Sequence, residues 1–202
     1  SGKEHYNPRL AAVAKLALMQ QRRTEINQHL EQLKLDDVPV HDVWSKDLFE
    51  HACHHSIRHG FDLMVKALHH PDHYLPMDWY LIRHVKIPLL LLSNNPIARA
   101  NTILMAVDLG SNKPLKKQLN QCVISQAKML AKATNCTLHL AYIIRVPKIL
   151  RDMDLVDTRT LIKDAYQRYQ QELAEIGLPQ DQLHILAGEP DLCLYELSCR
   201  LK

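Results

Sequence analysis

Residues 77–92 read MDWYLIRHVKIPLLLL and, after a polar joint, residues 101–108 read NTILMAVD. The first part predicts a short helix at 78–85 that leads through a proline into a fully apolar strand at 88–92. The second part predicts another apolar strand, which stops at the carboxylate of Asp108. We therefore expect the end of one α/β unit to meet the beginning of a second, with neither unit complete in this sequence.

The rest of the chain alternates between strand and helix patterns in the same way. Further strands are predicted at 38–44, 61–67, 103–107, 137–144 and 183–186. Helices are predicted at 8–33, 46–59, 115–130, 161–173 and from about residue 191 onward, with Gly60 and Gly177 closing two of them. Strands this apolar are expected to be buried on both faces, which predicts the α/β class: a parallel sheet covered by helices.

Composition limits the class of protein further. Of the 202 residues, 47% are apolar, which is enough for a sizeable core. The net charge of +3 is small and evenly spread, so we expect no nucleic-acid partner. No apolar run approaches the ~18 residues that span a bilayer and no signal peptide is visible, so we expect no membrane association. The five cysteines are an odd number without a C-x-x-C pair, which favours a reduced, cytoplasmic protein.

Two side chains of residues 77–92 are expected to stabilise the fold and not to bind a ligand. Asp78 is predicted to cap the helix, and the bulk of Trp79 is predicted to anchor that helix to the sheet. The four leucines at 89–92 are expected to lie against another strand, because a bare edge of this kind invites aggregation.

Five short segments together resemble a known family. They are AVD at 106–108, LHLAY at 138–142, GEP at 188–190, DWYLIR at 78–83 and IPLLLL at 87–92. The first three resemble the strand ends of the universal stress protein family. The last two are similar to the end of the first domain in tandem universal stress proteins of the E type. The resemblance covers about residues 8–202.

This resemblance implies a five-stranded parallel sheet in the order 3-2-1-4-5, with helices on both faces. Residues 1–94 would be the later part of a first domain, and residues 95–202 the early part of a second. The strand at 103–107 could then pair with the strand at 61–67 in a composite sheet. The favoured alternative is two separate sheets whose missing strands lie outside this sequence. Pairing through the strand at 88–92, within one chain or in a homo-oligomer, is also implied.

The resemblance implies a nucleotide site only in part. ATP-binding members of the family carry a glycine loop after the fourth strand, whose backbone amides hold phosphates. The corresponding residues 66–75 read KALHHPDHYL, without a glycine. We therefore expect ATP to bind weakly or not at all.

Four residues are the candidate ligand site by the same resemblance. Asp108 would face the adenosine part of a nucleotide, or else be a solvated turn residue. Leu140 matches a residue that lines the adenine slot, although a plain core leucine is the favoured interpretation. Gly188 and Pro190 are expected to shape a tight turn, with any ligand contact secondary.

A separate histidine pattern raises the question of zinc. His51, His55 and His59 are spaced four residues apart on one predicted helix, which can present imidazoles to one metal ion. Further ligands could come from His54, His69, His70 and His73. A polar helix face without metal is the favoured interpretation, because spacing does not establish convergence in space.

No nucleophile, base and acid can be assembled from spacing, so an enzyme is not predicted. The expected function is a cytoplasmic stress-response module that binds or regulates. The alternatives are an adenine-nucleotide-binding protein with slow ATP hydrolysis, and a cavity protein for a small molecule or metal.

Overall fold

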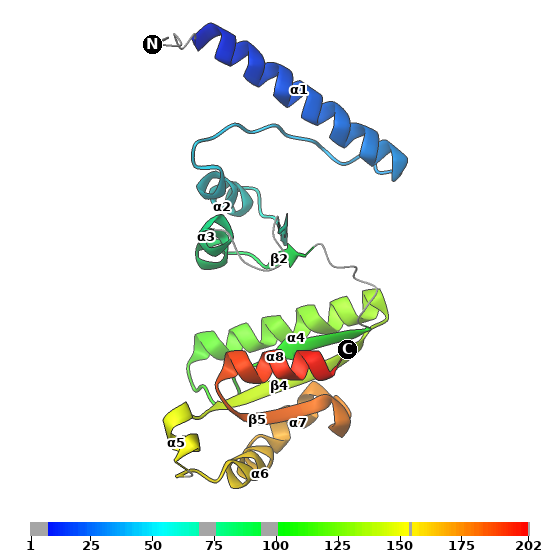
Figure 1. The fold of residues 1–202 in the computed structure, drawn as a ribbon. Helices are drawn as coiled ribbons and strands as arrows, with labels where there is room; N and C mark the ends of the chain where they lie inside the picture. The colour runs from blue at the N-terminus through cyan, green and yellow to red at the C-terminus, as the bar shows by residue number, and fades with distance from the viewer. Residues whose placement is uncertain (1–7, 69–75, 94–100, 154, 202) are drawn as a thin grey trace, which may run out of the picture. The chain divides into compact units, whose positions relative to one another are not determined.

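The computed structural model describes residues 8–68, 76–93, 101–153 and 155–201 (Figure 1). The chain divides into two compact units, an N-terminal unit of residues 1–95 and a C-terminal unit of residues 96–202. None of the helices in the described ranges is both long and apolar enough to cross a membrane.

The N-terminal unit contains a two-stranded parallel sheet. Its elements are α1 (Pro8–Gln32), α2 (Leu48–Arg58), β1 (Met64–Ala67), α3 (Pro76–His84) and β2 (Leu89–Leu92). β1 pairs with β2 from Met64 opposite Leu89 to Ala67 opposite Leu92. The predicted strand at 88–92 thus has a parallel partner along one edge, whereas its pairing with a strand of another unit stays a prediction. Gly60 follows α2 with a φ of +64°, a conformation that favours glycine, so this helix ends where the sequence predicted.

The prediction of a strand at 38–44 is wrong. These residues have no strand pairing and run as an extended segment that contacts α1. Arg23 Nε lies 2.7 Å from Asp42 Oδ2, and Lys15 Nζ lies 4.9 Å from the ring centre of Trp44. An extended segment becomes a strand only when a neighbouring strand accepts its hydrogen bonds, and here its neighbour is a helix.

The roles predicted for Asp78 and Trp79 are also corrected. α3 begins at Pro76, so Asp78 lies inside its first turn instead of capping it, and its side chain is 1% exposed. The Asp78 carboxylate is 2.5 Å from the ammonium group of Lys66 on β1. Trp79 is 46% exposed, while Leu81 is buried, so Leu81 anchors the helix.

The C-terminal unit is a three-stranded parallel sheet covered by helices. Its elements are β3 (Thr102–Ala106), α4 (Pro114–Thr134), β4 (Thr137–Arg145), α5 (Lys148–Asp152), α6 (Thr158–Arg168), α7 (Gln170–Ile176), the 3-10 turn η2 (Gln180–Gln182), β5 (Leu183–Gly188) and α8 (Pro190–Arg200). The strand order is β3-β4-β5. The helix predicted at 161–173 is divided in two at Tyr169.

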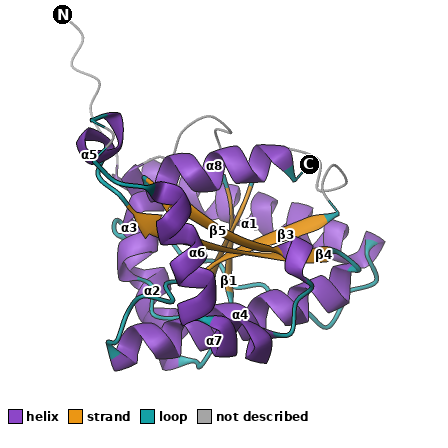
Figure 2. Cartoon of the chain, turned by 90° about the horizontal axis from the view of Figure 1, so that it is seen from below, coloured by secondary structure: helices purple, strands orange, loops and turns teal. Residues whose placement is uncertain are grey.

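The two faces of this sheet are covered by different helices. Alternate residues of β4, including Leu138, Leu140 and Tyr142, belong to one apolar core together with residues of α4, α6 and α7. His139, Ala141 and their alternate neighbours face the other side, where α8 packs on β4 and β5. Figure 2 shows α8 on one side of β3, β4 and β5, with α4, α6 and α7 on the other.

The composite sheet is not found among the described strands. β1 pairs with β2, whereas β3 pairs with β4 from Thr102 opposite Thr137 to Ala106 opposite Ala141. Each described strand takes its partner from its own unit, and a helical connection joins the two strands of each pair.

Candidate functional site

The candidate site lies beyond the carboxyl end of β3. In parallel sheets the helix termini and loops at this edge form the usual ligand sites. Two hollows of about 730 Å³ and 760 Å³ open here. They share four residues: Asp108, Gly110, Ser111 and Asn120.

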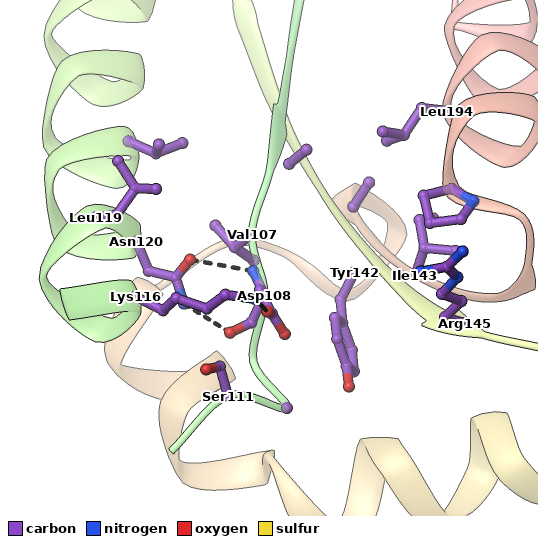
Figure 3. A pocket seen from close by; sticks show the side chains of 15 residues that line it. Val107, Asp108, Ser111, Lys116, Leu119, Asn120, Tyr142, Ile143, Arg145 and Leu194 are labelled. Carbon is purple, nitrogen blue, oxygen red and sulfur yellow. Dashed lines mark hydrogen bonds and ion pairs between the residues drawn. The ribbon is translucent and has the colours of Figure 1, made fainter. Parts of the chain in front are cut away.

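Asp108 is held in place by α4. The Asn120 amide oxygen accepts a hydrogen bond from the Asp108 backbone N–H at 3.1 Å, and its amide nitrogen donates to the Asp108 carbonyl at 2.9 Å (Figure 3). Lys116 Nζ donates to Asp108 Oδ2 at 2.7 Å. The carboxylate is thus positioned from one side, and its side chain, which lines both hollows, is still 45% exposed.

The first hollow has apolar walls and a polar rim. Figure 3 shows α4 on one side of it and α8 on the other, with β3 and β4 between. Ala106, Ala141 and Ile143 of the strands line the floor, and Leu119 of α4 and Leu194 of α8 line the walls. The polar rim is made by Asp108, Ser111, Lys116, Asn120 and Arg145. Such a lining suits a ligand with an apolar body and a hydrogen-bonding end.

Tyr142 closes the base of the site as a neutral group. Burial, and then a hydrogen bond to Tyr169, raise the pKa of Tyr142 to about 12. Its ring meets that of Tyr169 edge to face, with centroids 5.4 Å apart. A Cβ on Gly110 would lie 2.6 Å from the Tyr142 hydroxyl, so any larger residue at position 110 would require the Tyr142 ring or the loop to shift. Tyr142 cannot serve as a base near neutral pH.

Comparison with known proteins agrees with this architecture, although no family model matches the chain. Universal stress protein E of Escherichia coli K12 is 25% identical over 177 residues, which cover 82% of this chain and 56% of that protein. The chain is similar to universal stress protein E. The corresponding homolog of Haemophilus influenzae is 23% identical over 199 residues, covering 89% of this chain and 64% of the homolog.

Solved structures show the same fold. The crystal structure of a putative universal stress protein from Pseudomonas aeruginosa UCBPP-PA14 has a TM-score of 0.71 and 24% identity, covering 91% of this chain and 64% of that one. A functionally unknown protein of Pseudomonas aeruginosa PAO1 has a TM-score of 0.65 and 24% identity, covering 98% and 66%. The resemblance to the universal stress protein family and the α/β fold with parallel sheets covered by helices are thus confirmed. The chain spans little more than half the length of the Escherichia coli relative.

The structure places the four residues predicted from the universal stress resemblance in different surroundings. Asp108 lines both hollows and Pro190 lines the first. Leu140 has no exposed surface and lies in the core of the sheet. Gly188 is buried at the end of β5, where its carbonyl accepts a hydrogen bond from the Val146 N–H. Two of the four are therefore brought together at the site.

Sequence reasoning missed Asn120, Lys116, Gly110 and Tyr142. The sequence does contain a signal for Asn120, because this polar residue lies on the helix face that also carries the apolar Val123, Ile124 and Ala127. An amide among such residues is usually retained to bond a buried backbone group. Its partner, twelve positions earlier, could not be identified from spacing.

The predicted histidine face does form along α2. The ring centroids of His51 and His55 are 5.6 Å apart, and those of His55 and His59 are 4.2 Å apart. Partial burial, and then the neighbouring His59 and His51, lower the pKa of His55. In the part of the chain that the structure describes, no group of three or more His, Cys, Asp or Glu side chains is placed to hold a metal ion. His69, His70 and His73 lie outside the described residues.

Proposed function

We propose that this chain is a stress-response binding module that holds a small organic ligand at the carboxyl end of β3. The observation that carries the proposal is the hollow of about 730 Å³ in which the Asp108–Asn120–Lys116 network meets an apolar floor. The similarity to universal stress protein E supports the stress-response part. The binding part is supported by the lining itself.

The apolar floor and the polar rim define the class of ligand. Ala106 and Ala141 are small, which leaves room for a flat or aliphatic group against the sheet. Oδ1 of Asp108 can accept a hydrogen bond from a hydroxyl or amine, while Lys116 and Arg145 can donate to an oxygen at the rim. An amphipathic metabolite with hydroxyl or amine groups fits this arrangement.

A triphosphate fits less well. Phosphate recognition of the glycine-loop kind needs several backbone N–H groups that approach the ligand closely, and Gly110 is the single glycine among the residues that line the first hollow. Lys116 already neutralises Asp108. An adenine-nucleotide-binding protein with slow hydrolysis remains the second candidate, because Asp108 at a strand end can accept hydrogen bonds from ribose hydroxyls.

The three serines of the C-terminal unit favour binding over catalysis. The hydroxyl of Ser125 donates to the Cys122 carbonyl and that of Ser198 to the Tyr195 carbonyl, so each is engaged with its own helix. Ser111, at the rim, accepts a long bond of 3.4 Å from the Lys113 N–H. No histidine bonds to any of these hydroxyls in the described residues, so none is activated as a nucleophile.

Ligand capture tests this proposal. The chain is purified under native conditions, denatured, and the released small molecules are identified by mass spectrometry. We expect a bound amphipathic metabolite that is lost in Ala106→Phe, which fills the floor of the hollow, and retained in Thr102→Phe on the same strand face away from the hollow. Calorimetry with ATP should show no micromolar binding.

Two results would overturn the proposal. Equal ligand content in both phenylalanine variants would show that the hollow is not the binding site. Micromolar ATP affinity that is lost in Asp108→Ala would establish the nucleotide-binding alternative.

A further inference from the structure

A pair of histidines joins two strands on the α8 face of the sheet. His139 on β4 and His184 on β5 have stacked rings, with centroids 5.2 Å apart and planes at 19°. Nδ1 of His139 lies 2.9 Å from Nε2 of His184. The register sets Ala141 opposite His184, so the two rings meet on a cross-strand diagonal.

This contact limits how many protons the pair can carry. A hydrogen bond between two imidazoles needs one N–H and one bare nitrogen. The pair therefore keeps its geometry when both rings are neutral, or when only one is charged. If both rings are protonated, two N–H groups and two positive charges face each other across 2.9 Å. That state cannot keep the contact.

The environment of His184 disfavours its protonated form. Burial, then His139, then Arg200 at the end of α8 lower the pKa of His184, and Asp181 within η2 acts in the opposite direction. The residue opposite His139 on β3 is Leu104, which carries no charge. The later turns of α8 carry one acidic side chain, Glu196, and it is exposed to solvent.

We propose that the His139–His184 pair is an acid-sensitive latch that holds β5 and α8 in place near neutral pH and releases them when both rings become charged. This inference does not depend on which ligand the chain binds. It gives acidity a route to the site, because α8 supplies Pro190 and Leu194 to the first hollow.

The direction of the pH effect follows from linkage. A histidine with a lowered pKa in the folded protein takes up its proton more readily in the opened form. The stability that this histidine contributes is present above the ordinary pKa of about 6.5 and is lost as the pH falls through and below that value. Within this window the opening equilibrium grows by up to about tenfold per pH unit for each such proton.

Hydrogen exchange provides the test, because these are the only two histidines between residues 96 and 202. Exchange of β5 and α8 amides is measured by mass spectrometry at about pH 7.5 and about pH 5.5, on either side of the ordinary pKa, and corrected for the intrinsic pH dependence. We expect β5 and α8 to exchange several-fold faster at the lower pH, while amides in the middle of α4 change little.

Variants separate the latch from general acid sensitivity. His184→Gln does not titrate and can still bond His139, so the acid-induced increase should disappear. The matched control His84→Gln removes a histidine of α3 whose ring bonds to the Tyr80 carbonyl of the same helix at 2.8 Å, and should behave as wild type. An equal acid response in wild type and His184→Gln would overturn the latch. If that variant fails to fold, ring-proton NMR of wild type decides: two independent titrations, both near the ordinary value, would also overturn it.

Discussion

Replacing Asn120 by alanine should loosen the loop that carries Asp108. The substitution removes two hydrogen bonds, of 3.1 Å and 2.9 Å, and leaves the Asp108 N–H and carbonyl without their α4 partner. Each such bond contributes about 1 kcal/mol net. The site is only partly buried and water can replace part of the loss, so we expect a cost of about 1–2 kcal/mol. That corresponds to roughly a 5- to 30-fold change in the opening equilibrium.

Hydrogen exchange of the peptide that spans β3 and Asp108 measures this change directly. Alanine also raises helix propensity by roughly 0.5 kcal/mol, which works against the expected loss. Gln121→Ala, on the next and exposed position of α4, is the control for removing a polar amide side chain from this part of the helix. If Asn120→Ala accelerates exchange by less than about twofold relative to Gln121→Ala, Asn120 does not hold the loop, and the structural basis for the Asp108 site fails.

The remaining predictions concern the N-terminal unit. Asp78→Asn would leave the ammonium group of Lys66, whose side chain is 15% exposed, without its counter-charge. The free energy of unfolding should fall by about 3 kcal/mol. Urea unfolding followed by tryptophan fluorescence should show a lower midpoint, and an unchanged midpoint would contradict this. Leu90→Lys should disrupt any pairing of β2 with a strand of another copy, and unchanged sedimentation and melting temperature would contradict that pairing. Zinc should barely change the melting temperature. A bound ion at a hundred times its dissociation constant would stabilise the folded state by about 2.7 kcal/mol, so a rise of that size, abolished by His51→Ala, would reveal a metal site.

Elements with local signals could be predicted from the amino-acid sequence. The apolar run that becomes Thr102–Ala106 and the glycines that follow α2 and α7 depend on side chains within a few residues. Gly177, at a φ of +73°, ends its helix because glycine accepts this conformation without strain. Asp108 could be placed at a strand end for the same reason.

Only the tertiary structure decided which partner each polar group meets. Residues 38–44 have a strand-like pattern but lie against a helix, so no ladder forms. Asp78 is a residue type that commonly caps helices, but here it forms a buried ion pair with Lys66 on β1. Asn120 finds the backbone of Asp108 twelve positions away, and His139 meets His184 forty-five positions away. Local preference acts over one helical turn or one strand step, whereas these contacts depend on how α4 and β5 pack on the sheet, which no short pattern encodes.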